Sequence, residues 1–358
     1  MTTPAKCQNC GYSTRYSRQE PGEVPLFVRC CSGYLCAGCR KHRNCVRPSE
    51  PTPEAKARID LQQSVPVNDG WYSRIPDTVY HADRASLSSS GARRLMPPSA
   101  PAIFKAAQDE PPKPKPHYDF GHAAHKMVLG EGSDLFVLDP VIHGRTKEGK
   151  VAQNPAATSM WKAADQKARQ MGKSCITKEQ MGIAQIMAGR VFAHPIAAKL
   201  LDIDNGVAEY SGYWHDDETS VRLRLRPDWV YTPQRGRAIY VEYKSAISAE
   251  PKEFEKSVGK FGYHCQAAWQ LDGLAEVEVS DDAAHLFIVQ QKTPPFLVSV
   301  VQLDPEAIEL GRRQNRRAID IYAECSDRNQ WPGYGTGIYT ASLPGWLVKQ
   351  VEQQLEIV

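Results

Sequence analysis

The segment "RLRPDWVYTPQRGRAIYVEYK" (residues 224–244) decides the fold, because two strand-like runs flank a short polar turn. Residues 221–231 alternate between apolar and charged side chains, and residues 238–247 are rich in β-branched and aromatic types. Both patterns are typical of strands, and "TPQRGR" between them predicts a turn. Side chains alternate along a strand, so Glu242 and Lys244 point the same way, and the hairpin brings Asp228 towards them.

The rest of the chain predicts an alternation of helices and strands. Helical patterns are expected over 87–96, where a serine can cap the first turn, and over 120–130, 156–201, 255–275 and 305–325. Further strands are expected over 284–290 and 296–303. This order of elements is typical of an α/β fold.

Composition limits the function classes without selecting one. The chain has 358 residues, and its net charge of +3 is too small to indicate a partner by itself. No apolar run approaches the roughly 18 residues of a membrane span, and the N-terminus lacks the apolar core of a signal peptide. "MGKS" (171–174) resembles the end of a phosphate-binding loop, but Lys167 replaces its first glycine. We therefore expect a cytoplasmic protein without a membrane partner or an ATPase motor.

The charges of the hairpin suit metal-assisted hydrolysis of a phosphodiester. Hard cations such as Mg²⁺ prefer carboxylate oxygens, which Asp228 and Glu242 would supply. The cation would lower the pKa of a bound water, and Lys244 would orient that water or offset developing charge. The strand also carries three arginines that could hold a DNA backbone: Arg222, Arg224 and Arg226. The alternative interpretation of Glu242 and Lys244 is an ordinary surface ion pair, and of the arginines a solvated strand face.

Several motifs together resemble a known family. Pro227-Asp228 followed by Glu242-Tyr243-Lys244 has the form of the PD-(D/E)XK nuclease pattern. The chain also contains, in order, "LSSSGARRLM", "FGHAAHKMVLGEG", "HGRTKEGK", "HPIAAKLL" and "FGYHCQAAW". Across roughly residues 71–345 this series is similar to RecE-type phage exonucleases, the exonuclease VIII group. The resemblance implies a PD-(D/E)XK core, in which helices flank a mixed central sheet.

The resemblance also assigns roles to residues. It implies that Mg²⁺ or Mn²⁺ is bound by His125, Asp228, Glu242 and the backbone carbonyl of Tyr243. The catalytic set that it implies is Asp228, Glu242, Lys244 and Gln266. Gln270 stands where the family has a tyrosine, and we expect it to contact a phosphate or a base edge. His122 is expected to be an ordinary helical histidine.

The cysteines divide the chain into domains. Seven of the ten lie in the first 45 residues, which in a reducing compartment favours metal binding over disulfides. The candidate Zn²⁺ ligands are Cys7, Cys10, Cys30, Cys31, Cys36, Cys39, His42 and Cys45. An iron–sulfur cluster is the alternative, but relatives that carry one use cysteines on both sides of the nuclease domain, and only Cys325 is available there. We predict a zinc module (1–45), a proline-rich linker (46–70) and a nuclease domain (71–358).

The resemblance implies a Mg²⁺-dependent exonuclease on double-stranded DNA ends. It would remove the 5′ strand and leave 3′ overhangs for a RecT-type single-strand annealing protein, as a homo-oligomer. Three alternatives stay open on the residues alone: a restriction-type or repair-type endonuclease, a non-catalytic DNA-binding protein, and an enzyme that acts on RNA.

Overall fold

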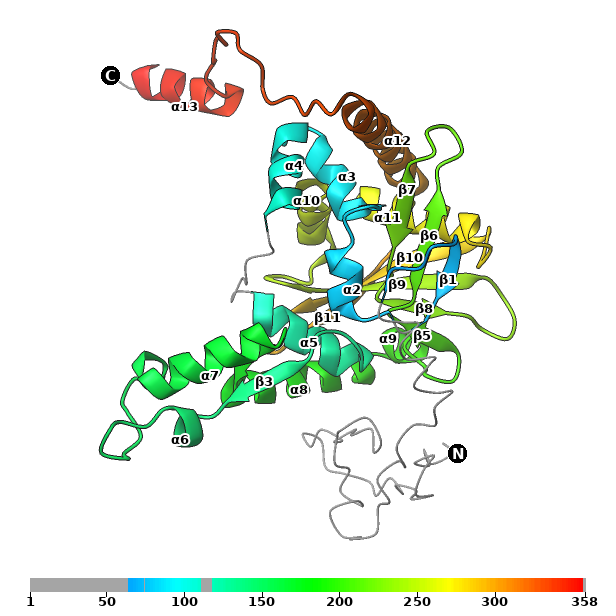
Figure 1. Cartoon of the computed structure of the whole chain (residues 1–358). Helices are drawn as coiled ribbons and strands as arrows, with labels where there is room; N and C mark the ends of the chain where they lie inside the picture. The colour runs from blue at the N-terminus through cyan, green and yellow to red at the C-terminus, as the bar shows by residue number, and fades with distance from the viewer. Residues whose placement is uncertain (1–63, 74, 111–117, 357–358) are drawn as a thin grey trace.

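A computed structural model of the chain describes residues 64–73, 75–110 and 118–356 (Figure 1). The predicted zinc module, its eight ligands and most of the linker lie outside these described residues. Among the described helices, none has the length and apolar character needed to cross a bilayer.

A five-stranded mixed sheet forms the centre of the molecule. Its strand order is β11-β10-β9-β8-β5, in which only β9 and β10 run parallel. The strands are β5 (Gly206–Ala208), β8 (Trp229–Tyr231), β9 (Ala238–Ala246), β10 (Ala283–Gln291) and β11 (Val298–Val301). The predicted hairpin is therefore the β8–β9 pair, with Trp229 opposite Val241.

Helices cover both faces of this sheet. Val241 and Tyr243 of β9 point to one face and pack with α5 (Asp119–Leu129), α8 (Lys178–Ala193) and α9 (Pro195–Leu200). The alternate residues of β9 point to the other face, where Tyr240 packs with α11 (Tyr263–Glu276) and α12 (Pro305–Arg328). The alternation that the sequence shows thus places Glu242 and Lys244 on the α11 side.

A second sheet continues from the first through one long bent hairpin. Its order is β1-β6-β7-β2, with β1 (Gly70–Tyr72), β2 (Leu87–Ser88), β6 (Ser211–His215) and β7 (Arg222–Leu225). The register that pairs Ala208 with Trp229 in the central sheet also pairs Gly212 with Leu225 in the second sheet. The bend lies between these pairs, at residues 209–210 on one arm and 226–228 on the other.

The remaining elements surround this framework. Helices α3 (Ser89–Leu95) and α4 (Pro101–Asp109) lie near α12, and α10 (Pro251–Phe261) precedes α11. A two-stranded parallel sheet, β3 (Leu135–Leu138) with β4 (Ser174–Thr177), lies beside α5. The other helices are α2 (Asp77–Ala82), α6 (Pro140–His143), η2 (Pro155–Ala157), α7 (Ser159–Gln170) and α13 (Gly345–Glu356).

Most predicted elements are confirmed, and three require correction. The strand expected over 221–231 is divided into β7 and β8, because Pro227 cannot donate a ladder hydrogen bond and the strand bends there. The helix expected over 255–275 is two helices that meet at Gly262. The helical segment expected over 156–201 contains β4, whose buried Cys175 and Ile176 pair with β3.

Candidate metal centre

The bend of the long hairpin places two carboxylates opposite each other. Continuing the register of β5 and β8 by one pair brings Glu209 opposite Asp228, and the Glu209 amide donates to the Asp228 carbonyl oxygen at 3.3 Å. Glu209 has a positive φ of 55°, a conformation that non-glycine residues seldom adopt. The bend therefore holds a strained backbone position at a pair of acidic side chains, and such strain is typical of functional sites.

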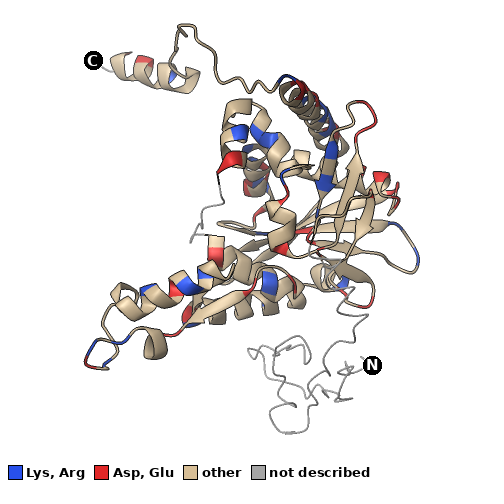
Figure 2. Cartoon of the chain, in the orientation of Figure 1, with Lys and Arg blue, Asp and Glu red and all other residues tan. Residues whose placement is uncertain are grey.

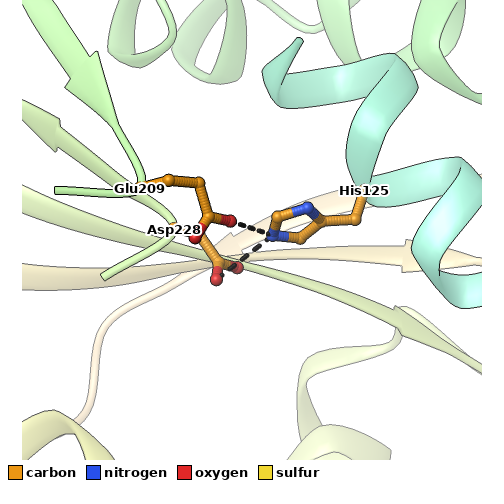
Figure 3. Close-up of side chains that lie close together, drawn as sticks. All are labelled: His125, Glu209 and Asp228. Atoms are coloured by element: carbon orange, nitrogen blue, oxygen red, sulfur yellow. Dashed lines mark ion pairs between the residues drawn. The ribbon is translucent and has the colours of Figure 1, made fainter. Parts of the chain in front are cut away.

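His125 on α5 completes this cluster, as Figure 3 shows. Its Nε2 lies 3.2 Å from Asp228 Oδ1 and 3.5 Å from Glu209 Oε1. The ring nitrogen on the other side lies beside Gly132, where an added Cβ would come within 3.1 Å of it. Because Gly132 also has a φ of +109°, a side chain at this position would be strained and would crowd the imidazole.

The three side chains balance their charges by holding protons. Burial lowers the pKa of His125, but Asp228 and Glu209 outweigh it and raise that pKa to about 9. Burial raises the pKa of Glu209 to about 8, with the negative charge of Asp228 adding to the effect. Burial opposes ionisation of Asp228 too, yet His125 and Lys244 bring its pKa down to about 2. At neutral pH His125 and Glu209 are therefore protonated and Asp228 is ionised, and a bound cation would replace these two protons.

Asp228 is also hydrogen-bonded to β9, the strand that carries the predicted catalytic residues Glu242 and Lys244. Its Oδ2 accepts the backbone N–H of Tyr243 at 2.9 Å, just beyond the last paired residue of β8. The side chain of Asp228 therefore continues the hydrogen-bond ladder along β9. This contact fixes the carboxylate against β9 at Tyr243, the residue whose carbonyl was predicted to bind the metal.

Glu242 and Lys244 form a buried pair rather than a surface one. Lys244 Nζ lies 2.8 Å from Glu242 Oε2, and Glu242 is only 1% exposed. Burial and the nearby Asp228 raise the pKa of Glu242, while Lys244 opposes them. Burial disfavours the charged form of Lys244, but Glu242 and Asp228 outweigh it and raise its pKa. The surface ion-pair interpretation of these two residues is therefore wrong.

Gln270 holds the other oxygen of Glu242. Its Nε2 donates to Glu242 Oε1, and its Oε1 accepts from His285 Nε2 at 2.7 Å. Burial, with Lys244 nearby, lowers the pKa of His285 to about 3, so the imidazole is neutral. Gln270 is only 3% exposed, and this position favours support of Glu242 over the predicted DNA contact, which stays untested. Gln266 lies one turn earlier on α11, on the same side of the helix.

The two arginines of β7 and Arg226 at the bend are occupied by protein groups. Arg224 Nη1 lies 2.8 Å from Asp83 Oδ2, and Arg226 Nη1 lies 2.8 Å from Asp77 Oδ1. Arg222 donates to the carbonyl of Pro66. Their DNA contact stays a prediction, and the observed contacts favour a structural role for Arg224 and Arg226.

The donor set of the cluster fits a divalent cation. Nε2 of His125 and carboxylate oxygens of Glu209 and Asp228 lie within 4.8 Å of one another, and each side chain is about a fifth exposed. Carboxylates suit Mg²⁺ and Mn²⁺, and imidazole is a ligand of transition-metal cations such as Fe²⁺ and Zn²⁺. A cavity of about 590 Å³, lined in part by Glu209, gives access to this side of the site. Such a cation would activate a water and polarise a phosphate.

The predicted and observed site residues overlap only in part. His125 and Asp228 are in contact, and Tyr243, Glu242 and Lys244 follow on the adjacent strand. The sequence prediction did not include Glu209. The sequence feature that could have identified Glu209 is the polar turn at 216–220. This turn would have revealed the long hairpin and placed Glu209 opposite Asp228.

The fold belongs to a known class, the PDDEXK-like domains. More specifically, the chain belongs to the family described as "PDDEXK-like domain of unknown function (DUF3799)", whose model matches residues 88–341. No functionally curated protein matches the chain.

Two solved structures show limited similarity. One is an inferred exonuclease from Eubacterium rectale, with 8% identity and a TM-score of 0.45, covering 76% of this chain and 97% of the other. The second is a protein named SSO0001, with 10% identity and a TM-score of 0.24, covering 57% of this chain and 85% of the other.

Proposed function

We propose that this chain is a divalent-metal-dependent DNA exonuclease of the RecE type. The observation that carries the proposal is the contact of Asp228 with His125, Glu209 and the Tyr243 amide, beside the buried Glu242–Lys244 pair. Membership of a PDDEXK-like family supports the nuclease class. The exonuclease assignment rests on the order of sequence motifs described above.

The side chains divide the work of hydrolysis in this proposal. His125, Glu209 and Asp228 hold the cation, which supplies an activated water and stabilises charge on the phosphate. Lys244 orients the attacking water and offsets negative charge, while Glu242 and Gln270 keep its ammonium in place. The same proposal includes Glu242 and the Tyr243 carbonyl as further ligands of the cation, and Gln266 as a catalytic residue.

The wider role proposed is resection of duplex ends. The enzyme would remove the 5′ strand, leave a 3′ overhang for a RecT-type annealing protein and act as a homo-oligomer, with Zn²⁺ in residues 1–45. Deletion of residues 1–57 tests the module, because unchanged DNA binding and processivity would remove any functional role for it.

The proposal is tested by digestion of linear and covalently closed duplex DNA in Mg²⁺, with the native chain and Lys244→Ala. An exonuclease degrades only the linear DNA, and the variant is inactive. Cutting of the closed circle would instead support the endonuclease. Binding without cleavage of either substrate would support a non-catalytic DNA-binding protein, and a preference for RNA would redirect the assignment.

A further inference from the structure

Arg93 is a half-buried cation at the edge of the candidate site. It lies in the last turn of α3, where that helix packs against α11 and α12. Its Nη1 donates to Ser89 Oγ at 3.2 Å and to the Gly262 carbonyl oxygen at 3.3 Å. Both acceptors are neutral. Figure 2 shows basic positions on α3 beside those of α12.

The start of α11 is shaped to admit this side chain. Gly262 has a φ of +65°, and an added Cβ would lie 2.6 Å from Arg93 Cδ. A side chain at 262 would therefore be strained and would displace the arginine. Gly262 also gives α11 no side-chain cap, so the positive end of the helix dipole faces the same region.

The Arg93 guanidinium has no carboxylate partner among the described residues within the 4.0 Å ion-pair distance. Arg169, Arg224 and Arg226 each have one at 2.7–2.8 Å. Burial lowers the pKa of Arg93, although the Glu242 carboxylate acts in the opposite direction. A partly buried cation without an anion costs folding free energy, so fold stability does not explain this placement.

Arg93 lies close enough to the Glu242–Lys244 pair for Glu242 to act on it electrostatically. Lys244 Nζ lies 5.0 Å from the centre of the Tyr263 ring, and Tyr263 follows the glycine that Arg93 crosses. Glu242 acts electrostatically on both Arg93 and Lys244. Two cations therefore flank the first residues of α11, beside the carboxylates that would activate the water.

We infer that Arg93 binds a phosphate of the nucleic-acid strand held for cleavage, and thus supplies the anion-binding part of the site. This assignment rests on the proposed nuclease function and adds its substrate contact. An arginine is suited to the task, because its planar guanidinium can bind two phosphate oxygens at once. The contact carries no sequence information, so it should act equally on every sequence.

The test compares Arg93→Gln with Arg94→Gln, whose side chain is exposed on the same helix. Both are made on the cleavage-deficient Lys244→Ala background, and binding of a fluorescent duplex with a short single-stranded end is followed over a range of salt concentrations. Loss of one phosphate contact reduces the slope of log K against log salt by about 0.7–0.9. We expect this change for Arg93→Gln, roughly equal on unrelated sequences, no change for Arg94→Gln, and retention of the slope by Arg93→Lys.

Thermal unfolding of the same variants separates binding from packing. Removal of an unbalanced charge should leave the Tm of Arg93→Gln unchanged or raise it. A lowered Tm with an unchanged salt slope would assign Arg93 to the packing of α3 on α11 and overturn the inference. If the native chain cleaves DNA but Arg93→Gln keeps the full slope and the native KM, the inference fails while the nuclease function stands. If the native chain neither binds nor cleaves nucleic acid, both fail.

Discussion

Two neighbouring parts of the long bent hairpin differ in how their charged side chains are paired. On β7, Arg224 is closed off by a buried ion pair with Asp83. At the bend a few residues later, Glu209 and Asp228 face each other, with His125 as the ion-pair partner they share. The first arrangement is balanced by a fixed arginine, whereas the second is balanced by protons on His125 and Glu209 that a cation could replace. This difference separates charges that support the fold from charges that prepare a site.

The largest effect is expected from Asp228→Asn. This change removes the anionic partner of His125 and of a bound cation, so we expect cleavage of linear duplex to fall by about 10³-fold or more. Folding should persist, because the side-chain oxygen of asparagine can still accept the Tyr243 N–H. Initial rates and Tm values measured together check both statements, and near-native activity would show that the site lies elsewhere.

In the Arg224–Asp83 ion pair, Asp83→Ala should reduce the stability of the fold rather than catalytic activity. Removing one partner of a buried pair leaves Arg224 uncompensated and costs about 3–5 kcal/mol of unfolding free energy. The matched control is Asp282→Ala, whose exposed pair with Arg237 should contribute less than about 1 kcal/mol. Denaturant unfolding gives both values. A loss of activity per folded molecule in Asp83→Ala, without a loss of stability, would erase the contrast between the two regions.

Glu209→Gln tests the residue that sequence reasoning missed. A direct ligand should matter at least as much as the outer partners of metal sites, whose loss weakens affinity or activity about 10–100-fold. Glu131→Gln is the control, because Glu131 is exposed and lines the same cavity. Activity titrated against Mg²⁺ should shift for Glu209→Gln alone. Equal behaviour of the two variants would remove Glu209 from the centre.

The smallest effect is expected in the pH dependence of stability, through His285, which is hydrogen-bonded to Glu242 by way of Gln270. Burial and Lys244 lower the pKa of His285 in the folded chain to about 3, from an ordinary value of 6.5, while Asp228 acts in the opposite direction. The unfolded chain therefore gains a proton below about pH 6.5 that the folded chain cannot take up, so stability falls as the pH drops. At about pH 5.5 the loss should be about 1.4 kcal/mol relative to His285→Gln. Urea unfolding at about pH 7.5 and 5.5 measures this difference, and parallel losses would contradict it.

The sequence predicted the part of the site that depends on local pattern. Alternation along β9 placed Glu242 and Lys244 on one face, and the hairpin brought Asp228 to the Tyr243 amide. Ser88 accepts the Gly91 amide at the start of α3, as expected of a cap. These features follow from side-chain alternation, turn residues and helix capping, which act over a few residues.

Other features depended on contacts that local patterns do not contain. Glu209 joins Asp228 only because one register continues through a bend between two sheets. Arg224 and Arg226 have the pattern of a charged strand face until Asp83 and α2 supply their partners. Gln270 faces Glu242 only through the packing of α11 on the sheet. Each case required the position of an element distant in sequence.

The central claim is that the carboxylates at the bend form a divalent-cation site, and Mn²⁺ binding tests it most directly. Equilibrium titration of the native chain and Asp228→Asn, with the titration heat measured in the absence of DNA, isolates this site from substrate effects. The account predicts a Mn²⁺ site in the native chain that disappears in the variant. Equal binding by the two proteins would contradict it.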